Sequence, residues 1–203
     1  MHWQRLDRDN TIKVIDSVKS ASDPGLITPG ASEVQSARLP FLDGILLYKI
    51  TNFSSLPSFT FEYLGDGTFF HYLDGTETPI YTVADKGLLR LTEATIVPYL
   101  EFFFGHVAGE DGEELLLIAN PHDMPLLDSL DPEAYDAVLR GHKPAGINAM
   151  GDGSFKVEAD LYDGGQLSRA NIDVSAAGRV SIAGRKLILQ NVARGAESGQ
   201  YRV

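Results

Sequence analysis

The sequence predicts an α+β fold, with a mixed or antiparallel sheet, a central aromatic-rich helix and a C-terminal antiparallel β-meander. Three observations support this prediction. Residues 91–109 place apolar side chains at helical spacing, and short alternating runs before them are joined by Asp-Gly turns. From residue 155 onward, alternating runs recur with turn signals roughly every 8–12 residues, which is typical of a meander.

The central helix is predicted between Leu91 and Gly109. Its apolar stripe follows the period of an α-helix, and three further aromatic residues widen it, so we expect the helix to be covered on more than one side. Thr92 or Thr95 can cap the first turn, and a cap at Thr95 places Pro98 where its missing N–H costs little. The stripe comprises Ile96, Leu100, Phe103 and Val107, and the widening residues are Tyr99, Phe102 and Phe104.

Before this helix, the chain begins with a predicted short helix and a loop. Asn10 or Thr11 can cap the helix, which ends near Ser20. Two Pro-Gly pairs in residues 20–32 then favour a loop or linker.

The next part of the chain favours strands. An apolar run suggests one buried strand, and two alternating runs about Gly65-Asp66-Gly67 indicate a hairpin. A further short run predicts a third short strand before the central helix. The expected strands cover residues 45–50, 59–63, 68–73 and 79–83.

Beyond the central helix, residues 110–114 form a charged turn, and Leu115–Ala119 predicts another buried strand. Residues 120–130 are irregular or hold one short helical turn. Asp131-Pro132-Glu133 is a strong helix start, because a capping residue, a proline and an acid occur in the order that a first turn favours. We expect that helix to reach Arg140 with Tyr135, Val138 and Leu139 inward, and meander strands at 155–161, 167–174, 180–182 and 187–192, before a frayed tail from Arg194.

The predicted organisation is one α+β domain over residues 1–203, with 1–37 as an N-terminal helix and loop arm. The alternative is two sub-units, 38–142 and 150–194, which meet at the Gly- and Pro-bearing connection 143–153.

Composition excludes several classes of function. The formal net charge is −11 with dispersed basic residues, so no basic face for nucleic acid is visible, and the same charge disfavours anionic membranes. No apolar run reaches the ~18–20 residues of a membrane span, and no signal peptide is visible, so we expect a cytoplasmic protein. The absence of cysteine excludes disulfides and thiolate chemistry.

The strongest candidate for chemistry is Asn120-Pro121-His122-Asp123, which directly follows a predicted buried strand. Loops beyond strand ends often carry function, so His122 is a candidate general base or metal ligand, with Asp123 to orient it. The alternative is that this turn only caps the segment that follows it. No histidine pair has the i, i+4 spacing of a zinc helix, and no motif indicates a cofactor.

Three segments resemble an uncharacterised family of bacterial proteins: Leu39–Tyr48, Leu73–Tyr81 and Leu89–Gly112. The family shares a strand that ends in a Leu-Asp-Gly turn, followed by a Leu-Thr-capped helix rich in Tyr, Leu and Phe. The resemblance implies a shared fold. It implies no activity and no site residues.

Two hypotheses for function follow. The first is a non-catalytic bacterial protein that binds a protein partner or associates with itself, because its surplus aromatic residues suggest an exposed apolar patch; a two-layer core would explain the same residues. The second is a small-ligand-binding protein or hydrolase-type enzyme, with its site at His122 and Asp123. The aromatic residues in question are Phe102, Phe103 and Phe104 in the helix, and Phe69, Phe70 and Tyr72 in one strand.

Overall fold

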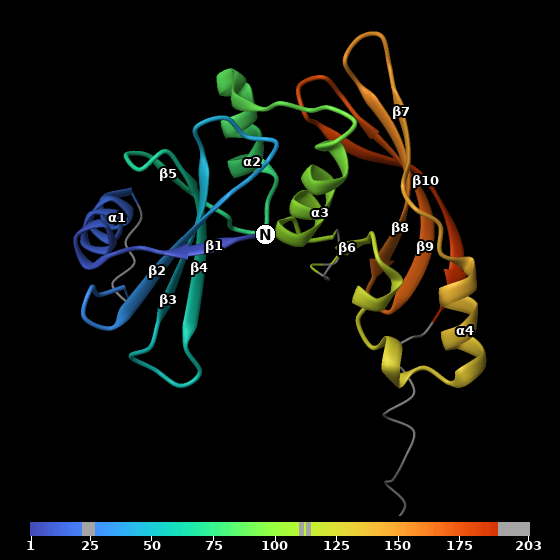
Figure 1. Ribbon diagram of the computed structural model, residues 1–203, viewed down its shortest axis with the longest axis horizontal. Helices are drawn as coiled ribbons and strands as arrows, with labels where there is room; N and C mark the ends of the chain where they lie inside the picture. The colour runs from blue at the N-terminus through green and yellow to red at the C-terminus, as the bar shows by residue number, and fades with distance from the viewer. Residues whose placement is uncertain (22–26, 110–111, 113–114, 191–203) are drawn as a thin grey trace, which may run out of the picture. The chain divides into compact units, whose positions relative to one another are not determined.

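A computed structural model describes residues 1–21, 27–109, 112 and 115–190 (Figure 1). The α+β prediction is confirmed, with two antiparallel sheets and four α-helices in the described ranges. The chain forms two compact units, an N-terminal unit, Met1–Arg90, and a C-terminal unit, Leu91–Val203. None of the helices in the described ranges has the length and apolar character that crossing a membrane requires.

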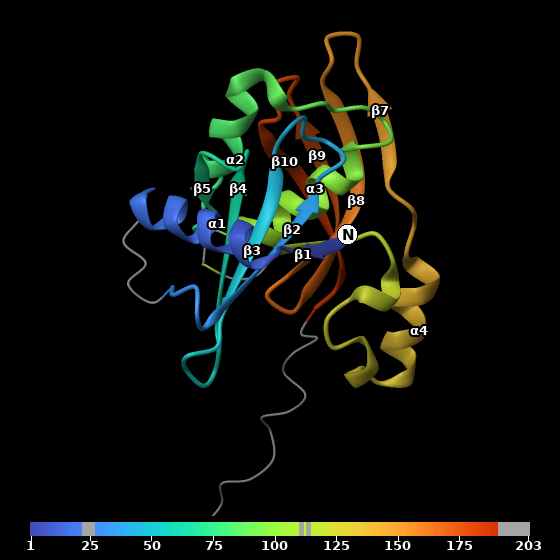
Figure 2. The ribbon, with the colours of Figure 1, turned by 60° about the vertical axis from the view of Figure 1, so that its left-hand side comes forward.

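The N-terminal unit is a five-stranded antiparallel sheet in the order β1-β2-β3-β4-β5, followed by α2 (Thr78–Val83) and the π-helical turn η1 (Ala84–Leu88). Helix α1 (Arg8–Ala21) packs on one face of this sheet (Figure 2). The predicted hairpin is confirmed as β4 and β5, and the predicted buried strand is β3. The strands are β1 (Trp3–Arg5), β2 (Ser32–Arg38), β3 (Leu46–Asn52), β4 (Phe59–Gly65) and β5 (Phe70–Tyr72).

The core of this unit lies between α1 and the sheet. Val14, Ile15 and Val18 form one stripe of α1 and are buried against side chains of β2, β3, β4 and β5. The helix begins before the predicted caps, because the carboxylate of Asp7 accepts a hydrogen bond from the backbone N–H of Asn10 at 2.8 Å. Asp7 rather than Asn10 or Thr11 therefore occupies the capping position.

Two expectations for this unit are wrong. Residues 79–83 lie in helix α2 rather than in a strand; Pro79 sits in its first turn, and Tyr81 N donates to Glu77 O at 3.0 Å. Residues 1–37 are expected to form an arm of helix and loop, but residues 32–37 belong to β2, which pairs with both β1 and β3. The first 37 residues thus contribute two strands to the sheet. Pro24-Gly25 lies outside the described residues.

The C-terminal unit is a second antiparallel sheet in the order β10-β9-β8-β6, in which β7 also pairs with β8. β6 and β7 share one edge of β8, because β6 pairs with residues 160–163 and β7 with residues 155–158. Helix α3 (Ile96–His106) lies on one face of this sheet and α4 (Pro132–Gly141) on the other (Figure 1). The strands are β6 (Leu115–Ile118), β7 (Gly146–Ala149), β8 (Phe155–Asp163), β9 (Gln166–Val174) and β10 (Val180–Leu189).

Both helices of this unit begin close to their sequence signals. Thr95 occupies the N-cap position of α3, but its side chain makes no capping hydrogen bond to the first turn and instead accepts from the backbone N–H of Thr92 at 2.8 Å; Pro98 falls in the first turn as predicted. Asp131 caps α4, where its carboxylate accepts hydrogen bonds from the backbone N–H groups of Glu133 and Ala134 at 3.0 and 2.9 Å. The predicted burial of α3 on several sides is confirmed by its buried side chains, Ile96, Tyr99, Leu100, Phe102, Phe103 and Phe104.

The meander is confirmed, with one difference. The runs expected at 180–182 and 187–192 form one strand, β10, whose register shifts between Ile182 and Gly184 and again between Leu187 and Leu189. Residues 191 and 192, the charged residues 110–111 and 113–114, and the tail from Arg194 lie outside the described residues.

The boundary between the two compact units lies elsewhere than the connection 143–153, where the alternative of two sub-units would meet. The two units divide after Arg90, whereas residues 143–153 lie inside the C-terminal unit. The physical reason is that 146–149 form β7, which the backbone of β8 holds in the sheet. The Gly- and Pro-bearing composition of that connection does not reveal this pairing.

Candidate functional site

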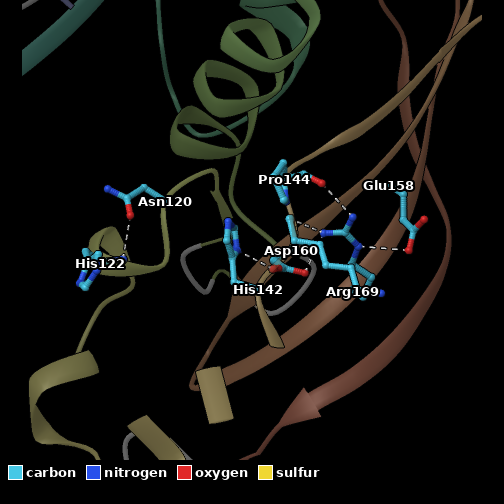
Figure 3. Close-up of polar contacts among 8 residues, drawn as sticks. Asn120, His122, His142, Pro144, Glu158, Asp160 and Arg169 are labelled. Atoms are coloured by element: carbon cyan, nitrogen blue, oxygen red, sulfur yellow. Dashed lines mark hydrogen bonds and ion pairs between the residues drawn. The ribbon is translucent and has the colours of Figure 1, made fainter. Parts of the chain in front are cut away.

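The sequence-predicted residues His122 and Asp123 lie in a 3₁₀ turn, η2 (Pro121–Asp123), directly after β6. Asn120 caps this turn, because its side-chain oxygen accepts a hydrogen bond from the backbone N–H of His122 at 3.2 Å. Both side chains are exposed, and Figure 3 shows the His122 ring apart from the carboxylate of Asp160. Among the described residues, no group of three or more side chains could hold a metal ion. The proposed chemistry of His122 and Asp123 stays a prediction.

A different histidine meets a buried carboxylate in the C-terminal unit (Figure 3). Nδ1 of His142 lies 2.8 Å from Oδ2 of Asp160, and Nη1 of Arg169 lies 3.1 Å from Oδ1 of the same carboxylate. Arg169 Nε also pairs with Glu158 Oε1 at 3.1 Å. The Asp160 side chain is only 2% exposed, so its charge depends on these partners. We call His142, Glu158, Asp160 and Arg169 the Asp160 cluster.

The fold assembles the Asp160 cluster from three elements. Asp160 and Arg169 face each other as direct cross-strand partners on β8 and β9. His142 is the C-cap residue of α4, where its backbone N–H donates to Val138 O. Val138 is buried in the apolar cluster beneath α4, which fixes the end of the helix over the sheet.

The contacts of Arg169 indicate a structural role for this cluster. Its Nη1 donates to the backbone oxygen of Lys143 at 2.8 Å, and its Nη2 to that of Pro144 at 3.1 Å. The guanidinium therefore ties the connection between α4 and β7 to the sheet while it neutralises Asp160. The pair of Asp160 and His142 resembles an oriented general base. However, Asp160 already forms an ion pair with Arg169, whose guanidinium holds the connection to the sheet.

Several grooves open on the described part of the C-terminal unit. One, of about 490 Å³, lies beside Glu158, and its lining includes Asn148, Lys156, Asn171 and Asp173. Another, of about 560 Å³, lies between the end of α3 and β10. Its lining combines apolar side chains with the ion pair of Asp163 and Arg185, and includes Phe103, Phe104, Val107, Leu115, Val180 and Ile182.

In the N-terminal unit, His71 of β5 meets Lys86 of η1. Nζ of Lys86 lies 3.0 Å from Nε2 of His71. Burial lowers the pKa of His71, and the charge of Lys86 lowers that pKa further, whereas Asp66 acts in the opposite direction. Asp66 itself accepts backbone hydrogen bonds from Phe69 and Thr68, and these bonds lower the pKa of its carboxyl. The contact between His71 and Lys86 joins residues that are fifteen positions apart in the sequence, and no local motif predicts it.

An exposed apolar surface of this unit lies at the end of the β3–β4 hairpin. The side chains of Phe53, Leu56 and Phe59 are 62%, 99% and 43% exposed. We call these three residues the apolar tip. Figures 1 and 2 both show this loop projecting from one end of the sheet.

Hydrogen bonds hold the loop of the apolar tip in place. Asn52 is 1% exposed, and its side-chain oxygen accepts from the backbone N–H of Ser54 at 2.7 Å and from the Ser54 hydroxyl. Its side-chain nitrogen donates to Ser32 at 3.2 Å, which links the loop to β2. The backbone N–H of Phe53 donates to Ala31 O at 2.8 Å. The apolar tip therefore projects from an ordered loop.

Comparisons with protein-family models, with curated proteins and with solved structures give no match to this chain. The functional argument therefore rests on the geometry above.

Proposed function

We propose that this protein is non-catalytic and acts by binding a protein partner through the apolar tip. The observation that carries the proposal is the exposure of Phe53, Leu56 and Phe59 on one hydrogen-bonded loop. Exposed apolar groups that gather at one place on the surface are typical of an interaction site. A few well-buried residues supply most of the binding free energy in protein interfaces.

The order of the loop supports the same proposal. Binding costs free energy whenever a flexible segment must be fixed, and a loop that is already ordered avoids that cost. Asn52 fixes the loop from inside, with contacts to Ser54 and Ser32. No charged residue occurs from Ile50 to Phe61, so the apolar tip carries none of the charges behind the net charge of −11.

The test is site-specific cross-linking followed by an affinity measurement. A photoreactive phenylalanine analogue replaces Leu56, the full chain is expressed in its native cells, and the adduct is identified by mass spectrometry. An adduct of one defined protein is expected, and an adduct of twice the chain mass would indicate self-association. The partner is then purified, and its Kd for the wild-type chain is measured.

Leu56→Ala should weaken that affinity by about 1.5–3 kcal/mol, which is roughly tenfold to a hundredfold in Kd. Phe69→Ala provides the matched control, because Phe69 is 67% exposed in the same unit but lies outside the apolar tip. Equal affinities for wild type and Leu56→Ala would overturn the proposal.

The alternative function is a small-ligand-binding protein or hydrolase-type enzyme at His122 and Asp123. Thermal unfolding of wild type and His122→Ala across a panel of metals and metabolites tests it. A ligand-dependent rise in Tm that His122→Ala abolishes would favour this alternative over partner binding.

A further inference from the structure

In the hydrogen bond between Lys86 and His71, the chemistry of lysine determines which atom is the donor and which is the acceptor. A lysine ammonium has only N–H donors, so at 3.0 Å from Nζ the Nε2 atom of His71 must be the acceptor. The imidazole is then neutral, with its proton on Nδ1. The lowered pKa of His71, which burial and then the Lys86 charge cause, agrees with a neutral ring.

The fold holds both groups in this contact. His71 lies in the middle of β5, where it pairs with Leu64 of β4 and is half-buried. Lys86 lies in η1, one residue before Gly87, whose φ of 75° ends the turn in the left-handed region. The backbone on both sides is thus fixed by pairing or by a tight turn, while the Lys86 side chain remains exposed.

Lys86 differs from the other lysines of this unit. Lys49 is engaged by Glu62, with 3.9 Å between Nζ and Oε1, and lies over the ring of Trp3. Lys13 and Lys19 are exposed on α1. Lys86 has no carboxylate ion-pair partner among the described residues, and its contact is instead a nitrogen base.

We propose that Lys86 is a site of acylation by small activated acyl donors such as acyl phosphates, with His71 as the base for the attacking nitrogen. The ammonium of Lys86 first loses one proton to water, and the resulting amine attacks the carbonyl carbon, so that a C–N bond forms. The bond between the acyl carbon and the phosphate oxygen breaks, and phosphate leaves with the electron pair. The surplus proton on nitrogen passes to Nε2 of His71 and then to water, so the product is an amide and the ring returns to its neutral form.

The experiment uses the full chain and acetyl phosphate as the probe. Initial rates of acetylation at Lys86, Lys13 and Lys19 are measured by mass spectrometry after digestion with a protease that does not cleave at lysine. Lys86 should react about a hundredfold faster than Lys13 and Lys19, which is the lower end of what a positioned base supplies. In His71→Gln, the Lys86 rate should fall to the rate of Lys13, while the rates at Lys13 and Lys19 stay unchanged.

Two outcomes would overturn the inference: equal rates at the three lysines of the wild type, or a Lys86 rate that His71→Gln leaves unaltered. A second measurement needs no variant. Nitrogen-15 NMR of the wild-type histidines should place the His71 proton on Nδ1 at neutral pH, and a proton on Nε2 would also overturn the inference, because the ring would then lack the lone pair that faces Nζ.

Discussion

Replacing Arg169 by Met should cost the C-terminal unit about 3 kcal/mol of unfolding free energy. The substitution keeps an unbranched chain but removes the guanidinium that faces Asp160, whose side chain is 2% exposed. Breaking a buried ion pair by removing one partner typically costs about 3–5 kcal/mol, because it leaves an uncompensated charge. We expect the lower end of that range, since His142 Nδ1 still contacts Asp160 Oδ2 at 2.8 Å.

The assay is urea unfolding followed by far-ultraviolet circular dichroism, with hydrogen exchange to locate the effect. Tryptophan fluorescence is unsuitable, because the single tryptophan, Trp3, belongs to the N-terminal unit. Exchange should accelerate in β8 and β9, which carry Asp160 and Arg169. The matched control is Arg140→Met, whose ion pair with Asp136 lies on the exposed surface of α4 and should contribute only about 0.3–0.5 kcal/mol.

A double variant separates the charge from the packing. Asp160→Leu combined with Arg169→Met removes both charges together, and much of the lost stability should return. If Arg169→Met unfolds within about 0.5 kcal/mol of wild type, or costs no more than Arg140→Met, the argument that Asp160 depends on Arg169 is refuted.

Two further predictions concern the N-terminal unit. Gly65→Ala should lower the unfolding free energy by about 1–3 kcal/mol in urea, because the added Cβ would lie 2.6 Å from Phe70 Cδ1 and 2.9 Å from Phe69 O; Gly30→Ala, with open space at its Cβ, is the control. Asp66→Asn should make the unfolding free energy depend less on pH in the acid range. The folded-state pKa of Asp66 is lowered, so the stability that its carboxylate contributes is present above the unfolded pKa, near 4. That stability is lost as pH falls through the folded-state pKa. Urea midpoints between about pH 6 and pH 3 measure this, and identical slopes would contradict it.

The elements that the sequence predicted correctly are those whose signals are local. Asp131 caps α4 with its own side chain, and the cap, the proline and the acid all lie within one turn. The Asp-Gly turn at 66–67 is fixed because the carboxylate of Asp66 accepts hydrogen bonds from the backbone N–H groups of Thr68 and Phe69. Such signals need no information about distant parts of the chain.

The missed strands depend on their neighbours instead. Ser32–Arg38 is polar enough to suggest a loop, yet β1 and β3 supply hydrogen bonds along both of its edges. The residues of β7 are all exposed, so no burial pattern marks them, and the pairing with β8 alone defines the strand. Side-chain periodicity predicts a strand through burial, and it fails where the backbone ladder alone supplies the stability.

The candidate sites show the same limit. The sequence singled out His122 because Asp123 adjoins it, but the histidine that contacts a buried carboxylate is His142, whose partner Asp160 lies eighteen positions away. Asp160 alternates with Ala159 and Leu161 as an outward-facing strand residue would. Its burial results from α4 on that face, and the alternation along β8 cannot indicate which face a helix covers.

The apolar tip shows that one alternating run of apolar residues can include both core and exposed side chains. Phe59, Phe61 and Tyr63 alternate on one face of β4, yet exposure is 43% at Phe59 and 3% at Tyr63, with Phe61 half-buried. The apolar core under α1 includes Tyr63 and reaches Phe61, but it does not extend to Phe59. The alternation therefore identifies the face, and the extent of the helix decides which residues belong to the core. Phe59, Phe53 and Leu56 add little to folding, and the hydrogen bonds of Asn52 keep their loop ordered. A partner would then bury the exposed part of these side chains without first having to order the loop.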